Sequence, residues 1–508
     1  MYDFVTYFML MGAVASGGGA LPFWATANQY GLMPEGSGGL ALVSARTSFD
    51  ESKTFQWRWG ACVAASLSGT DVSLLGYDAA PGAVYSYEKV AFRPMVDELY
   101  VSGRWKVLRA DVGMFHRERE FLGASAAMGS LSSTEGHIVE SNNARTMPGY
   151  KLTLEPLSVP FTKDHLKIFG SWGDYRTLDD RYVDGALVHR TLAYLRYDIS
   201  PAWFVQLGLD HYAMWGGLSP DFGDMGASFS NYLRVVTGQS ASATGTLNDQ
   251  LNVIGDQGGA EQLRAGWRGR GCSVTFQYEK PYSDKSGMRL ANFPDGVYTL
   301  HFSFDNKDKW VSDVLAEFKY TMWQSGTIHD MSAKLDGNAE KYGGYYLGCD
   351  NYFTNCEYRC GWTHYGRSIC DPQFYTSEFL SRAALGYYSD VPLRAVHNSR
   401  FKAIHIGVSG KLFRVAPYKL MLTQSWNYGS YGSPYLPPSS YASTWKWWQR
   451  NTIDRGLPQF CGAFLAALPL SAVSGSRLPL SFTAGLYLDR GKVLPSSFAA
   501  SLGISIIL

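Results

Sequence analysis

The residues Phe55-Gln56-Trp57-Arg58-Trp59-Gly60-Ala61-Cys62-Val63-Ala64-Ala65-Ser66-Leu67 carry an apolar side chain at every odd-numbered position. The even-numbered positions are more polar and include Gln56, Arg58 and Ser66. Because successive side chains of a β-strand point to opposite faces, this alternation predicts a strand with one apolar and one mixed face.

The same period of two recurs along the chain. Further apolar rows occur at 108–114, 203–209, 314–322, 478–488 and 498–508. These segments reach about 9–11 residues, which is the length that a tilted strand needs to cross a bilayer. Soluble strands are commonly about 5–6 residues long. In lipid every backbone group must be bonded internally, which strands achieve only in a closed sheet. The predicted fold class is therefore all-β, as a transmembrane outer-membrane antiparallel β-barrel.

Length and composition fit one large barrel. At roughly 28 residues for each strand and its loop, the 508 residues give about 18 strands. We therefore treat 1–508 as a single barrel domain. Charged residues make up 18%, below the quarter or so that is typical of soluble chains. No apolar run is long enough for a transmembrane helix. Lys and Arg (45) balance Asp and Glu (44) without a basic stripe, which argues against a nucleic-acid partner.

Both ends of the chain carry an apolar segment. Phe4–Ala15 resembles the apolar core of a signal peptide, but no Lys or Arg precedes it and Asp3 stands where a positive charge is expected. The alternative is a first strand at Tyr7–Ser16, followed by a glycine turn, and we prefer it for that reason. The apolar row at the other end runs to the last residue, Leu508, where bacterial barrels usually carry an aromatic residue.

Two segments break the alternation. Residues 116–132 have a helical composition, and 224–238 space their apolar residues as a helix does, with Asp224 available as its N-cap. Large barrels often hold helices or loops in the lumen. We predict that both segments are short helical plug elements in or near the lumen.

The stretch Cys349-Asp350-Asn351-Tyr352-Phe353-Thr354-Asn355-Cys356-Glu357-Tyr358-Arg359-Cys360-Gly361-Trp362-Thr363-His364-Tyr365-Gly366-Arg367 is rich in rings and amides and poor in aliphatic residues. One interpretation is an aromatic belt at the membrane interface. The other is a carbohydrate surface, in which rings stack on sugars and polar groups bond the hydroxyls. Four cysteines crowd into this region, Cys349, Cys356, Cys360 and Cys370. Their spacing does not fit a zinc site, and loop disulfides and unpaired thiols both remain open.

Motifs of known enzymes are absent. The chain has no H-E-x-x-H, no P-loop and no clean G-x-S-x-G sequence. The histidines are scattered, so we predict no catalytic residue, no cofactor and no metal. The sequence leaves open a Ser/His/Asp site assembled from distant strands.

An ordered set of short motifs resembles the Wzi-like capsule assembly proteins of Bacteroidetes-type bacteria. Each motif is weak alone, and together they span nearly the whole chain. They are Pro22–Trp24, Asn28–Gly31, Asp97–Val101, Arg104–Trp105, Val112–Gly113, Ser286–Gly287, Asn292–Gly296, Gln324–Gly326, Asp350–Tyr352 and Gly361–Gly366. The cysteines at 349–370 are a departure from the family pattern.

The resemblance implies a barrel of about 18 strands with a blocked lumen and a non-enzymatic, lectin-like function. The protein would bind capsular or other surface polysaccharide and assist capsule assembly, with outer-membrane lipid around it. The residues expected to contact the polysaccharide are Arg289, Asp295, Trp323, Tyr345, Tyr346, Asn351, Tyr352, Trp362, His364 and Tyr365. The alternatives are a passive outer-membrane porin and a barrel enzyme acting on lipid or glycan. The sequence indicates no oligomeric state.

Overall fold

The structure is a computed structural model. It describes residues 2–15, 21–34, 36–69, 72–74, 85–87, 91–116, 126–243, 245–283, 285–290, 292–324, 352–376, 379, 395–430, 456–471 and 479–507.

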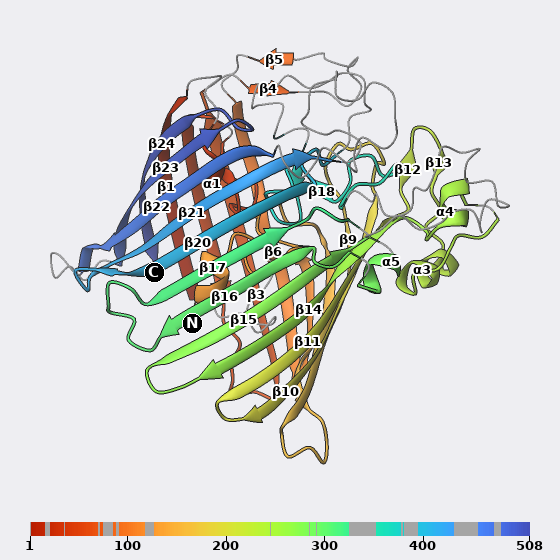
Figure 1. Ribbon diagram of the computed structural model, residues 1–508, viewed down its shortest axis with the longest axis horizontal. Helices are drawn as coiled ribbons and strands as arrows, with labels where there is room; N and C mark the ends of the chain where they lie inside the picture. The colour runs from red at the N-terminus through yellow and green to blue at the C-terminus, as the bar shows by residue number, and fades with distance from the viewer. Residues whose placement is uncertain are drawn as a thin grey trace.

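Eighteen strands form one antiparallel sheet (Figure 1). In chain order they are β1 (Tyr2–Ala15), β2 (Gly38–Thr47), β3 (Phe55–Ser68), β6 (Ala91–Trp105), β7 (Leu108–Met114), β8 (Gly149–Ser158), β9 (Leu166–Arg176), β10 (Leu187–Ser200), β11 (Trp203–Trp215), β14 (Asp256–Arg268), β15 (Cys272–Tyr282), β16 (Gly296–Phe304), β17 (Asp313–Tyr320), β20 (Arg400–Leu412), β21 (Ala416–Gly429), β22 (Leu457–Pro469), β23 (Leu480–Gly491) and β24 (Ser497–Ile507).

Each strand pairs with its neighbours in the chain, and the first strand also pairs with the last. The β1–β24 ladder runs from Val5 opposite Ile507 to Ala15 opposite Ser497. The sheet is therefore a closed barrel, as predicted, and the N-terminal segment is a strand.

The apolar rows face outward. Phe55 and Trp57 of β3 are 61% and 58% exposed, whereas Arg58 is only partly exposed and reaches Asp111 on the inner wall. A closed sheet with an apolar outer surface and a polar inner wall is the architecture of a transmembrane barrel. The protein is accordingly a β-barrel of the bacterial outer membrane.

The two ends of the barrel differ in their connections. At one end the strands are joined by short turns such as 106–107, 201–202 and 413–415, and both termini lie there (Figure 1). The longest connections, 115–148, 216–255 and 321–399, emerge at the other end. Short turns of outer-membrane barrels face the periplasm, which places the long-loop end at the cell surface.

Described parts of three long connections fold into the lumen, and we call them the plug: 21–34, 126–148 and 352–376. Helix α1 (Phe23–Thr26) packs against inward-facing residues of β2, β21, β22 and β23 in one apolar cluster. Tyr352, Trp362 and Phe374 pack against inward-facing residues of β10, β11 and β20 in a second cluster. The plug and the wall thus pack together in two shared apolar clusters.

Buried polar groups fix the plug in place. Glu317 of β17 accepts hydrogen bonds from the hydroxyls of Ser132 and Ser133. The ammonium of Lys319, two positions along the same strand, pairs with Asp371, and both side chains are fully buried. Charges at such depth are tolerated only when they are paired and hydrogen-bonded.

The two predicted helical segments lie on different sides of the barrel wall. In the first, the described helix is α2 (Ala126–Leu131), which lies in the lumen against β17 and β20, while 117–125 fall outside the described residues. In the second, α3 (Phe229–Val236) is capped by Ser228 and not by Asp224. It is not a plug element, because Val235 packs on Ala213 and Trp215 of β11. These residues alternate with the inward-facing Tyr212 and Met214, so α3 covers the outer wall (Figure 1).

The other described elements are short. The remaining helices are α4 (Leu247–Leu251) and α5 (Lys285–Met288). Three small ribbons lie outside the barrel sheet: β4 (Val72–Leu74) with β5 (Tyr85–Tyr87), β12 (Leu218–Ser219) with β13 (Gly223–Asp224), and β18 (Thr363–His364) with β19 (Arg367–Ser368). Among the described residues no helix has the length and apolar character to cross a membrane.

The outward orientation of Val63 near the middle of β3 generates a prediction. Val63→Arg is expected to destabilise the folded barrel by about 2–4 kcal/mol, because a cation on the lipid face must leave water. Val63→Leu is the matched control and should change stability little. Urea unfolding in lipid vesicles measures both, and equal stability of the two variants would contradict a lipid-facing position.

Candidate functional site

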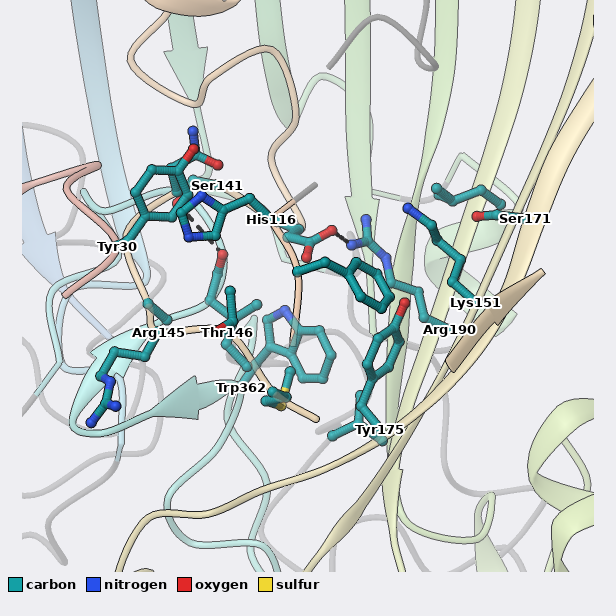
Figure 2. Close-up of a pocket in the computed structure, with 18 residues that line it drawn as sticks. Tyr30, His116, Ser141, Arg145, Thr146, Lys151, Ser171, Tyr175, Arg190 and Trp362 are labelled. Carbon is teal, nitrogen blue, oxygen red and sulfur yellow. Dashed lines mark hydrogen bonds and ion pairs between the residues drawn. The ribbon is translucent and has the colours of Figure 1, made fainter. Parts of the chain in front are cut away.

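The candidate functional site is a gap between the plug and the inner wall (Figure 2). Its volume is about 80 Å³. That is room for several water molecules, and well below the 300 Å³ or so of a typical ligand pocket. The wall side is built by β8, β9 and β10, and the plug side by 140–147 with Tyr30, His116 and Trp362.

The lining of the gap is rich in positive charge. It holds three fixed cations, Arg145, Lys151 and Arg190, and one carboxylate, Glu140. Arg190 pairs with Glu140 across the gap and, at 2.6 Å, with Asp210 behind it on β11. Figure 2 shows Lys151 and Arg190 reaching in from the strands toward the plug.

More cations continue along the wall from the gap. Arg58 of β3, Arg109 of β7 and Lys151 of β8 all lie within 4.0 Å of the Asp111 carboxylate. Glu155 lies 3.8 Å from Arg109 and offsets a second charge. Together these five side chains carry a net charge of +1. Solvent reaches this part of the lumen, since Glu155 and Arg58 are partly exposed.

The plug side of the gap is held by specific contacts. The rings of Tyr30 and His116 stack at 3.6 Å with an angle of 9° between their planes. His116 Nε2 lies 2.9 Å from Asp97 Oδ1 on β6. The backbone N–H of Ser141 donates to Ile369 O at 2.8 Å, which joins two parts of the plug. The gap is therefore a fixed feature of the folded chain.

The structure brings three of the predicted polysaccharide contacts together, but as a structural node. The Asp295 carboxylate accepts the backbone N–H of Trp323 at 2.8 Å and of Gln324 at 2.7 Å, and the hydroxyl of Tyr352 at 2.7 Å. Asp295 and Tyr352 are fully buried, whereas Trp323 remains partly exposed. Burial raises the pKa of Asp295 to about 6, although these donors oppose the shift.

The other predicted contacts are scattered. Trp362 is buried, stacks on Tyr212 with ring centroids 4.0 Å apart, and donates its indole N–H to Val139 O at 2.7 Å. Tyr365 is partly exposed and lies beneath the Arg145 guanidinium. Arg289 is exposed on the loop between β15 and β16. Tyr345, Tyr346 and Asn351 fall outside the described residues.

His364 is buried and bonded at both ring nitrogens. Its Nε2 accepts the backbone N–H of Leu178 at 3.2 Å, so Nδ1 carries the proton and donates to Arg145 O at 3.0 Å. Burial lowers its pKa to about 4. His364 therefore holds the plug as a neutral group and is not presented to a polymer outside the cell.

The structure describes three of the four cysteines that crowd into this region. Cys370 is a free thiol, fully buried in the plug, and Cys349 lies outside the described residues. In the part of the chain that the structure describes, no three His, Cys, Asp or Glu side chains gather as a metal site does.

Sequence reasoning missed Arg190, Lys151 and Glu140, which line the gap. One signal was available, because the apolar row at 108–114 leaves Arg109 and Asp111 on the opposite face of that strand. Extending that rule to β8 and β10 would have placed Lys151 and Arg190 on the inner wall. Glu140 is in an irregular loop and carried no such signal.

The Asp295 node generates a stability prediction. Asp295→Ala leaves two backbone N–H groups, the one of Gln324 buried, and the buried hydroxyl of Tyr352 without their acceptor, and is expected to destabilise the long-loop end by roughly 3 kcal/mol. Asp308→Ala removes an exposed carboxylate and should cost little. Thermal unfolding and limited proteolysis compare the two, and equal behaviour would contradict an anchoring role.

His364 generates a pH prediction. Because its folded pKa lies below the ordinary 6.5, its contribution to stability is complete above pH 6.5 and is lost as the pH falls toward 4. The loss is up to about 3 kcal/mol for this contact. Hydrogen exchange at 177–182 and 362–368, corrected for intrinsic rates, should therefore speed up from pH 7.5 to pH 5. His364→Asn should abolish that pH dependence, and a retained dependence would rule out His364 as its cause.

Comparisons with known proteins returned only solved structures. No family model matches the chain and no curated protein does. Pseudomonas aeruginosa OccK5 (OpdH) matches with a TM-score of 0.45 at 7% identity, over 100% of this chain and 97% of that one. P. aeruginosa OccD3 (OpdP) gives 0.45 at 8%, over 100% and 91%, and Acinetobacter baumannii OccAB4 gives 0.45 at 7%, over 100% and 97%. We take no substrate or partner from likenesses at this level.

These findings correct two predictions. The structures that match are outer-membrane porins of the Occ group and not Wzi capsule proteins, so the resemblance to the Wzi-like family was wrong. The lectin-like function in capsule assembly that it implied was wrong as well. The physical reason is burial. Asp295, Tyr352, Trp362 and His364 are buried in contacts that hold the loops, so a polysaccharide cannot reach them.

Proposed function

We propose that the protein is a passive outer-membrane channel that admits water and small solutes, with a preference for anions. The observation that carries this proposal is the gap beside the plug, whose lining holds Arg145, Lys151, Arg190 and one carboxylate, Glu140. Asp210 and Asp111, which pair with Arg190 and Lys151, do not line the gap. Transport through such a channel needs no chemical step. The lipid partner is the bilayer around the apolar outer wall.

The polar inner wall supports this function. If the lumen only had to pack against the plug, apolar residues would be sufficient to line it, as they do in the two apolar clusters. The wall beside β3, β7 and β8 instead carries charged side chains that keep partial access to water. Fixed cations at a constriction raise the local concentration of anions and lower that of cations.

The narrowness of the gap limits what passes. A space of about 80 Å³ suits water and small ions, whereas a larger solute would require 140–147 to move away from the wall. The hydrogen bonds that join this segment to 368–369 make such a movement costly. We therefore expect a small conductance.

Planar-bilayer recording tests the proposal. The wild-type channel should show a small, steady conductance, with a reversal potential in a KCl gradient that favours Cl⁻ over K⁺. Lys151→Glu should lower that preference about twofold or more, because it exchanges a cation for an anion at the constriction.

Lys163→Glu is the matched control, since it makes the same charge change in the exposed turn between β8 and β9. It should leave selectivity near the wild-type value. Absence of any conductance from correctly folded protein would overturn the channel assignment, and equal shifts in both variants would exclude the gap as the path.

A further inference from the structure

Three polar residues meet on the outer wall of the barrel near its long-loop end. Asp174 lies on β9, and His189 directly opposite it on β10. Thr191 follows His189 by two positions on the same strand, so both side chains share one face. That face is the outer one, because Arg190 between them points into the gap inside the barrel.

The three side chains form a continuous relay of hydrogen bonds. His189 Nδ1 lies 2.8 Å from Asp174 Oδ1, and His189 Nε2 lies 2.8 Å from Thr191 Oγ1. An ionised carboxylate can only accept, so the proton of the imidazole is on Nδ1. Nε2 is then an acceptor, and the hydroxyl of Thr191 donates to it. A hydroxyl, a base and an acid in this order are the arrangement of an activated nucleophile.

Further contacts hold the acid and the base. The second oxygen of Asp174 accepts the hydroxyls of Tyr150 and of Tyr232, the latter at 2.9 Å. Tyr232 comes from α3 and in turn accepts the indole N–H of Trp172 at 2.9 Å. The Trp172 ring meets the ring of His189 edge-on, with centroids 4.6 Å apart. The base is thus fully buried and oriented from three sides, whereas Thr191 stays partly exposed.

A shallow, open depression lies on the Asp174 side of the relay. It is lined by Asp174 and Tyr232 together with Tyr150, Arg176, Leu187 and Trp215 among others, and it does not include Thr191 or His189. Leu187 and Trp215 give it an apolar part, and Arg176 provides a cation that suits a phosphate group. Farther down the same wall the outward-facing side chains are apolar, including Leu195 and Leu207.

We propose that Thr191, His189 and Asp174 form a second functional site that hydrolyses carboxylic esters of membrane phospholipids. Thr191 Oγ attacks the ester carbonyl carbon while its proton passes to His189 Nε2. The tetrahedral adduct then releases the glycerol oxygen, which takes that proton, and leaves an acyl group on Thr191. Water attacks the acyl carbonyl, gives one proton to His189 and releases the fatty acid, and His189 returns the proton to Thr191.

The position of the relay selects this substrate class. Thr191 lies on the surface that faces lipid, close to the end of the strands where the hydrocarbon meets the headgroups. The ester groups of phospholipids lie at that depth, with acyl chains along the apolar wall and phosphate at the rim beside Arg176. Asp174 is the positioning residue, because it acts on the reaction only through the base, His189. The inference does not depend on the channel proposal, which concerns the opposite face of the wall.

The test uses the full chain refolded from inclusion bodies, so that no host lipase accompanies it, and reconstituted in dioleoylphosphatidylcholine vesicles. Release of oleic acid is followed by mass spectrometry. Heat-modifiable migration on gels confirms that each variant is folded. Wild-type protein should release fatty acid, and a fluorophosphonate probe should modify Thr191.

Matched variants separate catalysis from structure. Thr191→Val keeps the shape and removes the hydroxyl, and should reduce the rate at least 100-fold, whereas Thr191→Ser should retain it within about tenfold. Asp174→Asn should lower kcat with little change in KM. Absence of hydrolysis and of the adduct in folded wild-type protein would overturn the proposal, as would an unchanged rate in Thr191→Val. Neither result would bear on conductance, so the two proposals fail separately.

Discussion

The structure depends on the hydrogen-bonded seam between β1 and β24. An open sheet in a bilayer would leave a full row of N–H and C=O groups unpaired, and each such group costs several kcal/mol in hydrocarbon. The ladder from Val5–Ile507 to Ala15–Ser497 removes both edges at once. Once the sheet is closed, every strand must present one face to lipid and the other to the lumen. The alternation in β3 and its counterparts follows from that requirement.

Closure also creates a lumen that is too wide to be filled by side chains of the wall alone. Parts of three long connections fold inward and occupy the lumen. Apolar contacts supply most of the packing, while Glu317 and the Lys319–Asp371 pair determine where the plug sits. A buried ion pair adds little net stability when compared with an apolar substitute, but it disfavours any arrangement that separates the partners. The gap beside β8–β10 is what this packing leaves open.

The two faces of one strand carry two different chemistries. On β10, Arg190 points into the gap and takes part in its electrostatics, and the residues on either side of it point to the outer wall. His189 and Thr191 are polar where lipid-facing strands are otherwise apolar, and α3 covers part of them through Tyr232. The position of α3 outside the barrel is thus connected with a polar cluster that would be costly in bare contact with lipid.

The sequence by itself determined the all-β class, about 18 strands and the alternation of apolar and polar positions in rows such as Phe55–Leu67. These properties follow from a period of two and from strand length, which are local. It did not determine the function, because the motifs around Asp295, Tyr352 and Trp362 reflect loop anchoring as readily as sugar contact. The gap and the outer-wall relay join residues from separate strands and loops, such as Glu140 with Arg190 and Asp174 with His189. Only strand register and loop packing decide such pairs, since a shift of one residue would turn each side chain to the other face.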